Sequence, residues 1–138
     1  MAVKLSDSVR NARLDSIEST IGASPKLQIR SGAAPANCAA ADSGTLLCEM
    51  TLPADFMAAA AAGVKGKNGT WSGTGHANAG GGTNAGHFRI KDSAGTNCHL
   101  QGTITGTSGG GDMELDNISI ATGQTVTVNS FNLTDGNA

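Results

Sequence analysis

The chain has few of the residues that enzyme active sites and nucleic-acid-binding surfaces most often use. It contains no tyrosine, one tryptophan and three phenylalanines among its 138 residues, and only 14% of the residues are charged. The net charge of −2 weakens the case for nucleic acid or an anionic membrane as a partner, because both attract clusters of basic side chains. Sugar clefts commonly use aromatic platforms, so this composition also disfavours glycoside cleavage by a pair of carboxylates.

Long hydrophobic runs are lacking as well. The longest nearly apolar run, residues 56–64, is mostly alanine and is too short to cross a bilayer. Residues 1–20 do not contain the continuous apolar stretch of a secretory signal. We therefore predict a soluble protein made in the cytoplasm, in which the N-x-S/T sequences at Asn68, Asn117 and Asn132 are not glycosylated.

The three cysteines are an odd number at irregular spacing, which does not suggest a disulfide framework. For a protein made in the cytoplasm we expect reduced thiols. Cys48 and Cys98 occupy apolar positions of predicted strands and should be buried. Cys38 lies in an alanine-rich loop and should react first with thiol reagents.

Residues 1–22 are predicted to form an N-terminal helix or arm. Ser6 or Asp7 can cap its start, and Gly22 stands where a glycine commonly ends a helix. The apolar face is expected to point inward and consists of Val9, Ala12, Ile17 and Ile21. The polar face is expected to point outward and consists of Ser8, Arg10, Arg13, Asp15 and Glu18. The apolar stripe is narrow, so the helix must pack on its own sheet or on another chain.

Residues 23–138 are predicted to form one β-sandwich domain. Apolar and polar residues alternate with a period of two in about eight short segments, which turn signals separate. No long helix lies between these segments, so we expect an all-β, antiparallel jelly roll or sandwich. In the last segment the apolar positions change from even (Val126, Val128) to odd (Phe131, Leu133), which predicts a β-bulge.

Three stretches between the strands are predicted to be irregular. Residues 54–62 suggest a short helical turn that Gly63 closes, and residues 67–70 (Lys-Asn-Gly-Thr) suggest a hairpin turn. The glycine-rich stretch 72–86 has no large anchoring side chain, so we expect an exposed, mobile loop. Its run 80–83 is not a phosphate cradle, because a P-loop needs a Lys-Ser/Thr pair that enters a helix.

Residues that could carry chemistry are scattered along the chain. Among His76, His87, His99 and the cysteines only Cys98 and His99 are adjacent, and neighbours on a strand point to opposite faces. Residues 109–117 (GGGDMELDN) echo a calcium-binding repeat that works only as stacked copies, and one copy is present. No nucleophile elbow surrounds any serine or cysteine. We therefore predict no catalytic, cofactor-binding or metal site, and a protein that is not an enzyme.

Five stretches of the chain resemble a family of small structural proteins of tailed bacteriophages. They are HFRIKDSAGT (87–96), HLQGTIT (99–105), MELDNISIATGQTVTV (113–128), LSDSVRNARLDSI (5–17) and LQIRSGAAP (27–35). The likeness extends over nearly the whole chain and is closest to head decoration, or cement, proteins. Proteins of this kind sit as a jelly roll on the capsid surface and clamp neighbouring shell subunits.

The resemblance implies a virion structural protein that binds the outer surface of the major capsid protein shell and stabilises the head. We expect it to be made in the host bacterial cytoplasm, to reside on the capsid and to form a homo-oligomer, most simply a dimer. The expected partners are the major capsid protein and a second copy, without nucleic acid or membrane. A tail or neck component, a fibre module that binds host glycans and a non-viral secreted β-domain remain the alternatives.

Overall fold

The computed structural model describes residues 3–138, which form a short α-helix and a curled β-sheet. The helix is α1 (Asp7–Ile21), and a 3-10 turn, η1 (Ala77–Ala79), precedes the longest hairpin. The strands are β1 (Lys26–Ser31), β2 (Leu46–Thr51), β3 (Val64–Gly66), β4 (Ser72–Thr74), β5 (Thr83–Lys91), β6 (Cys98–Gly106), β7 (Met113–Leu115), β8 (Ser119–Ile120) and β9 (Thr125–Thr134).

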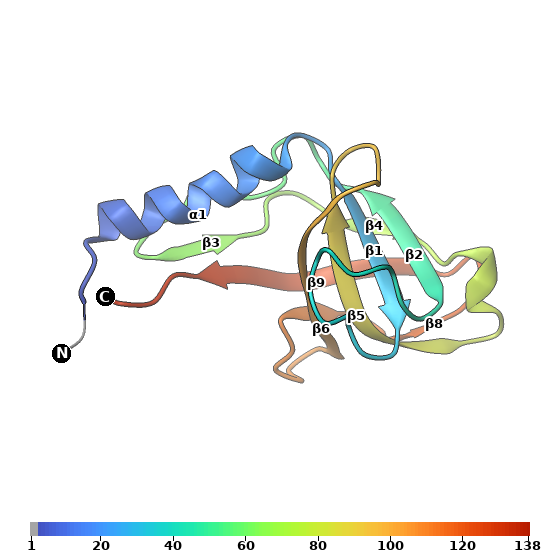
Figure 1. Cartoon of the computed structure of the whole chain (residues 1–138). Helices are drawn as coiled ribbons and strands as arrows, with labels where there is room; N and C mark the ends of the chain where they lie inside the picture. Colours follow the sequence, from blue (N-terminus) through green and yellow to red (C-terminus); the bar gives the residue numbers. More distant parts are fainter. Residues whose placement is uncertain (1–2) are drawn as a thin grey trace.

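The strands lie in the order β2-β1-β5-β6-β7-β9-β3, with β4 beside β9 and β8 beside β5. The segment that follows β4 brings the two ends of the sheet together. Gly75 forms a bridge with Cys48 of β2, and the backbone N of His76 donates to the Leu47 carbonyl at 2.7 Å. The sheet therefore curls back on itself around one core (Figure 1), which confirms the predicted sandwich-like, all-β fold with a short N-terminal helix.

One pairing departs from the predicted antiparallel arrangement, because β6 and β7 run parallel, with Ile104 beside Met113. Residues 107–112 carry the chain back along β6, where Asp112 accepts hydrogen bonds from the backbone N and the hydroxyl of Thr103, both at 2.9 Å. Parallel strands usually need a long crossover. Here β7 has only three residues, so a short glycine-rich return is sufficient.

The core is organised around Trp71, which is fully buried. Its ring centroid lies 6.2 Å from that of Phe56 and 5.7 Å from that of Phe131. Phe131 in turn meets Phe88 edge-on at 5.4 Å. These four residues are all the tryptophan and phenylalanine of the chain, so its scarce aromatic side chains are concentrated in one place. Each such pair contributes about 0.5–1.5 kcal/mol beyond the area it buries.

The bulge predicted for β9 is confirmed. Glu114 lies beside Ser130 and Leu115 beside Val128, so Asn129 is an extra residue without a partner on β7. The extra residue changes the phase of the strand, which allows Val128 and Phe131 both to point into the core.

The predicted caps of α1 are confirmed. The prediction of its faces is confirmed for Ile21, which is buried, and for Ile17, which packs against the core, but it is wrong for Val9, Ala12 and Arg10. The hydroxyl of Ser6 accepts from the backbone N of Val9 at 3.3 Å, and Gly22 ends the helix at φ 89°. Val9 is 45% exposed, whereas Arg10 is only 7% exposed. The helix turns Arg10 and Glu18 inward because the segment it packs against presents polar backbone groups and a buried lysine, as described below.

The predictions for residues 54–70 are also wrong. Residues 57–61 are extended beside β3 and join it through a two-residue turn, in which Ala62 (φ 50°) and Gly63 (φ 75°) both adopt left-handed backbone. There is no hairpin at residues 67–70, because β3 and β4 both lie antiparallel to β9 and the chain continues between them in one direction. Pairing with β9 therefore overrides the local turn signal of Asn68-Gly69.

The glycine-rich stretch 72–86 is not the mobile loop that its composition predicts. It forms β4, η1 and the start of β5. Its glycines permit close backbone approach: a Cβ on Gly75 would lie 1.9 Å from the Ala121 carbonyl oxygen, and one on Gly86 would lie 2.2 Å from that of Gly32. A residue without a side chain is needed at Gly75 because the sheet closes there, and at Gly86 because the chain that leaves β1 passes close to β5.

Figure 1 shows α1, β3 and the end of β9 extending together beyond the curled part of the sheet. We call this part, residues 5–21, 57–66 and 132–137, the arm. The described ends of the chain meet at its tip, where the backbone N of Leu5 donates to the Asn137 carbonyl at 2.7 Å. Within residues 3–138, no helix has the length and apolar character to cross a membrane.

Candidate functional site

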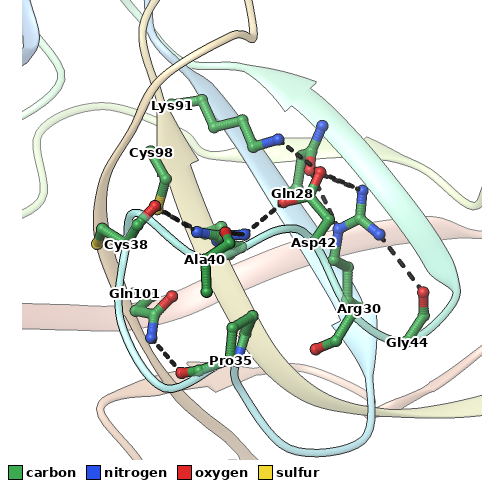
Figure 2. Close-up of polar contacts among 12 residues, drawn as sticks. Gln28, Arg30, Pro35, Cys38, Ala40, Asp42, Gly44, Lys91, Cys98 and Gln101 are labelled. Carbon is green, nitrogen blue, oxygen red and sulfur yellow. Dashed lines mark hydrogen bonds and ion pairs between the residues drawn. The ribbon is translucent and has the colours of Figure 1, made fainter.

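A cluster of charged and polar side chains lies on the outer face of β1, β5 and β6, beneath loop 32–45 (Figure 2). We call this surface the covered face. Side chains alternate along β5, so Phe88 and Ile90 point into the core while His87, Arg89 and Lys91 point toward the loop. All five side chains are buried, so both faces of β5 are covered, whereas a strand with one face in water would have only every second side chain buried. Loop 32–45 thus acts as a second layer over the middle of the sheet.

Asp42 of this loop is the anionic centre of the covered face. Its carboxylate accepts from Arg89 Nη1 at 2.6 Å, from Lys91 Nζ at 2.6 Å and from Arg30 Nη2 at 3.1 Å. Burial on its own would raise the pKa of Asp42. The hydrogen bond from Lys91 and the charges of the three cations outweigh burial and hold that pKa below its usual value.

Arg89 connects the loop to the sheet. Besides Asp42 it donates from Nη1 to the Ala40 carbonyl at 3.0 Å and from Nη2 to the Cys38 carbonyl at 2.7 Å. Its Nε donates to the sulfur of Cys98 at 3.2 Å. The side chain is 2% exposed, so the guanidinium is satisfied almost entirely by protein groups. A buried charge with this many acceptors fixes the path of the loop.

Cys98 lies on the covered face and not in the core, which corrects the prediction from its sequence position. Leu100 pairs with Ile90, but Cys98 pairs with Lys91, so His99 is an extra residue that shifts the phase of β6. Cys98 is therefore only partly buried, as is Cys38, whereas the prediction that Cys48 is buried is confirmed. Burial raises the pKa of the Cys48 thiol to about 11.

Cys38 and Cys98 lie at the same guanidinium, because Arg89 donates to the Cys98 sulfur at 3.2 Å and to the Cys38 carbonyl at 2.7 Å. Burial first, and then the neighbouring Cys98, raise the pKa of the Cys38 thiol to about 11. Both cysteines border a hollow of about 550 Å³, which is lined by residues 38–42, Arg89, Lys91 and residues 96–98. Small molecules in solution can therefore reach this pair of thiols.

The histidines considered as zinc ligands do not come together. His76 precedes η1, where its Nδ1 accepts from the backbone N of Asn78 at 3.1 Å, and His99 is exposed on β6. His87 is fully buried beneath the loop, with Nδ1 2.9 Å from the Gly32 carbonyl oxygen. Within residues 3–138 no group of three or more His, Cys, Asp or Glu side chains could hold a metal ion.

The other two candidate motifs, residues 80–83 and 109–117, form parts of the fold. The run 80–83 leads straight into β5, as predicted, and not into a helix. In the segment 109–117, Asp112 is bonded to Thr103, and Glu114 accepts from the backbone N of Gly110 at 3.2 Å. These carboxylates close the turn between β6 and β7.

A second cluster, which the sequence did not reveal, holds α1 on the arm. Lys65 is 2% exposed, and its Nζ lies 2.7 Å from Asp15 Oδ1, 2.8 Å from Glu18 Oε2 and 2.9 Å from the Ala58 carbonyl oxygen. The hydrogen bond from Lys65 is the main reason that the pKa of Asp15 is lowered. Asp15 and Glu18 also accept from the backbone N of Ala60 (3.0 Å) and Met57 (3.1 Å). These contacts pair two acids of the helix with one buried ammonium, while Arg13, whose side chain is 57% exposed, pairs with Asp135 at 3.1 Å.

Comparison with known proteins adds no family to these observations. No protein-family model matches the chain, and no curated protein or solved structure matches it.

Proposed function

We propose that this chain is a structural protein of a tailed-bacteriophage virion, which decorates the head by binding the outer surface of the major capsid protein shell. The observation that carries the proposal is a stripe of exposed, uncharged residues on α1, presented on an arm that extends from the curled sheet. The resemblance of residues 87–128 and 5–17 to phage decoration proteins supports the same assignment.

The outer side of α1 has the composition of a surface that is covered in use. Ser8, Val9, Ala12 and Ser16 are all exposed, and none carries a charge. Protein interfaces are depleted of charged residues at their centres, because a charge that loses water without gaining a partner is costly. Asp15 and Arg13, whose side chains are 49% and 57% exposed, form ion pairs with Lys65 and Asp135, so another protein can cover the four uncharged residues without leaving these two charges unpaired.

The position of the arm suits docking on a repeated lattice. It reaches beyond the curled sheet, so a shell subunit can contact α1 without disturbing the core (Figure 1). A contact of standard size buries about 1,600 Å² in total. Many equivalent contacts around one shell add avidity, so each one need only be modest. A two-fold contact between copies would use a single patch twice, which makes a dimer the simplest oligomer.

Quantitative mass spectrometry of purified virions tests the location of the protein. We expect a copy number comparable to that of the major capsid protein, and particles that lack the protein should assemble but release their genome on heating or in low salt. A few copies per virion would overturn head decoration in favour of a tail or neck position. Particles without the protein that resist heating but fail to attach to cells would overturn it in favour of host binding.

A pair of matched variants tests the docking surface. Ala12→Glu places a charge on the outer side of α1, and Ala77→Glu places the same charge on the exposed 3-10 turn, away from the arm. Both proteins should fold as the parent does. We expect shells that lack the protein to bind the parent and Ala77→Glu but not Ala12→Glu. Equal binding of both variants would exclude α1 as the contact surface.

A further inference from the structure

We propose that Cys38 and Cys98 form a site of covalent modification, at which a low-molecular-weight disulfide oxidises the two thiols to an intramolecular disulfide that fastens loop 32–45 to β6. This inference does not depend on the proposed virion function. It rests on three features of the covered face: the phase shift that turns Cys98 toward the loop, the way Arg89 holds both residues, and their access to solvent.

The two cysteines lie sixty positions apart in the sequence, yet the fold brings them to one guanidinium and to the lining of one hollow. The phase shift at His99 turns Cys98 away from the core and toward the loop. On the other side, the turn that contains Cys38 is well defined. The side-chain oxygen of Asn37 accepts from the backbone N of Ala39 at 2.9 Å and of Ala40 at 3.0 Å.

Arg89 holds the two cysteines in place from a single side chain. Its Nε donates to the Cys98 sulfur and its Nη2 to the Cys38 carbonyl, at 3.2 and 2.7 Å. A second sheet residue also holds the loop, since Gln101 Nε2 donates to the Pro35 carbonyl at 2.6 Å (Figure 2). Disulfide formation needs two cysteines that are held side by side, and these contacts hold Cys98 and the backbone of the loop that carries Cys38 at one guanidinium before any bond forms.

The reaction is two successive thiol–disulfide exchanges. The sulfur of Cys98, as the thiolate, attacks one sulfur of the small disulfide, forms a mixed disulfide and expels one small thiolate. Cys38 then gives its proton to water and attacks the Cys98 sulfur, which releases the second small thiolate. The two cysteines lose two electrons in total, and the small disulfide gains them. Cys98 attacks first, contrary to the expectation from the sequence that Cys38 is the more reactive thiol, because the Arg89 guanidinium donates directly to the Cys98 sulfur at 3.2 Å.

Cys48 provides an internal control. It is buried in the core with no exposed surface, so neither a small disulfide nor another thiol can reach it in the folded protein. The chain therefore contains one reactive pair and one protected thiol.

The experiment treats the full-length protein with oxidised glutathione under native conditions. We expect two of the three thiols to disappear, and Cys48 to remain free until the protein is unfolded. Digestion with trypsin and Asp-N separates Cys38 (residues 31–41), Cys48 (residues from 42) and Cys98 (residues 92–111). A single cross-link between 31–41 and 92–111 is expected, in the parent and in Cys48→Ala.

Variants and a second probe distinguish the intramolecular disulfide from simple addition of glutathione. Cys38→Ser should stop at the first exchange and retain one glutathione on Cys98, whereas the mixed disulfide should not accumulate in the parent. Phenylarsine oxide binds two neighbouring thiols without oxidation, so it should add once to the parent and to Cys48→Ala but not to Cys98→Ser. Circular dichroism establishes that each variant is folded. A folded parent that forms no cross-link, or one that links Cys48, would overturn the proposal.

Discussion

Replacement of Asp42 by asparagine should destabilise the protein more than any other single-atom change on the covered face. The substitution keeps the shape of the side chain but removes the one carboxylate that Arg89, Lys91 and Arg30 share at 2.6, 2.6 and 3.1 Å. Arg89 and Lys91 are only 2% and 8% exposed, so they cannot recover much hydration when the negative charge is lost.

The size of the effect follows from burial. Removal of one partner of a buried ion pair costs about 3–5 kcal/mol. The side chain of Asp42 is 29% exposed, so solvent screening lowers the loss, and we expect about 2–3 kcal/mol. A chain of this size loses roughly 3–4 °C of melting temperature per kcal/mol, so the midpoint should fall by about 8 °C.

The assay is urea unfolding at neutral pH, followed by the fluorescence of Trp71, which is the only tryptophan and is fully buried. Glu49→Gln is the matched control, because Glu49 is an exposed carboxylate of β2 that accepts one hydrogen bond, from Gln28 at 2.7 Å. The control should cost less than about 1 kcal/mol. Equal losses in the two variants would refute the assignment of Asp42 as the centre of the cluster.

The same variant has a defined pH dependence. The pKa of Asp42 is lowered in the folded protein, so its contribution is fully present above the unfolded value of about 3.9 and is lost as the pH falls through the folded value. The difference in stability between the parent and Asp42→Asn should therefore be largest at neutral pH and should shrink below about pH 4. A difference that stays constant down to the acid-unfolding limit would contradict the role of the ionised carboxylate.

Three further predictions concern the arm and the glycines. Lys65→Met should lower the free energy of unfolding by about 1–2 kcal/mol, because it removes the ammonium that Asp15 and Glu18 share. Hydrogen exchange should become faster in α1 than in β6, and unchanged exchange in α1 would argue against this anchor. Ala62→Asn should raise the melting temperature by about 2 °C, since asparagine tolerates the left-handed φ of 50° better than alanine does, and a fall would contradict the turn assignment. Gly75→Ala should lower stability by more than about 3 kcal/mol, because its Cβ would lie 1.9 Å from a carbonyl oxygen. The control is Gly81→Ala, whose Cβ would have nothing within 4 Å, and it should change stability by less than about 0.5 kcal/mol in the same urea titration.

Local features of the chain were predictable where one short segment contains the whole cause. The alternation in β5 and β9 identified both strands and the bulge at Asn129, because side chains of a strand point to opposite faces whatever the sheet around them. Ser6 and Gly22 marked the ends of α1 because the free backbone groups at a helix end are satisfied by residues that are neighbours in the sequence.

The candidate site was not predictable in this way, because its parts come from separate segments. Arg89 and Lys91 alternate with Phe88 and Ile90, and this pattern alone predicts that the two cations face water. The one available signal was the length of loop 32–45, which is unusually long for a connection between two hairpin strands. It suggested that the loop has a role, but not that Asp42 would meet the cations of β5.

The sequence by itself determined that the chain is β-rich with one N-terminal helix, because periodicity and caps act over a few residues. Only the tertiary structure decided which side of α1 faces water, where Cys98 points and how the glycine-rich stretch is ordered. In each case a distant partner outweighs a local preference: Lys65 attracts the acids of the helix, Cys98 meets Cys38 after a phase shift in β6, and the backbone at Ala121 approaches Gly75. The free energy of such long-range contacts exceeds that of any local pattern, and it becomes available only when the chain has folded.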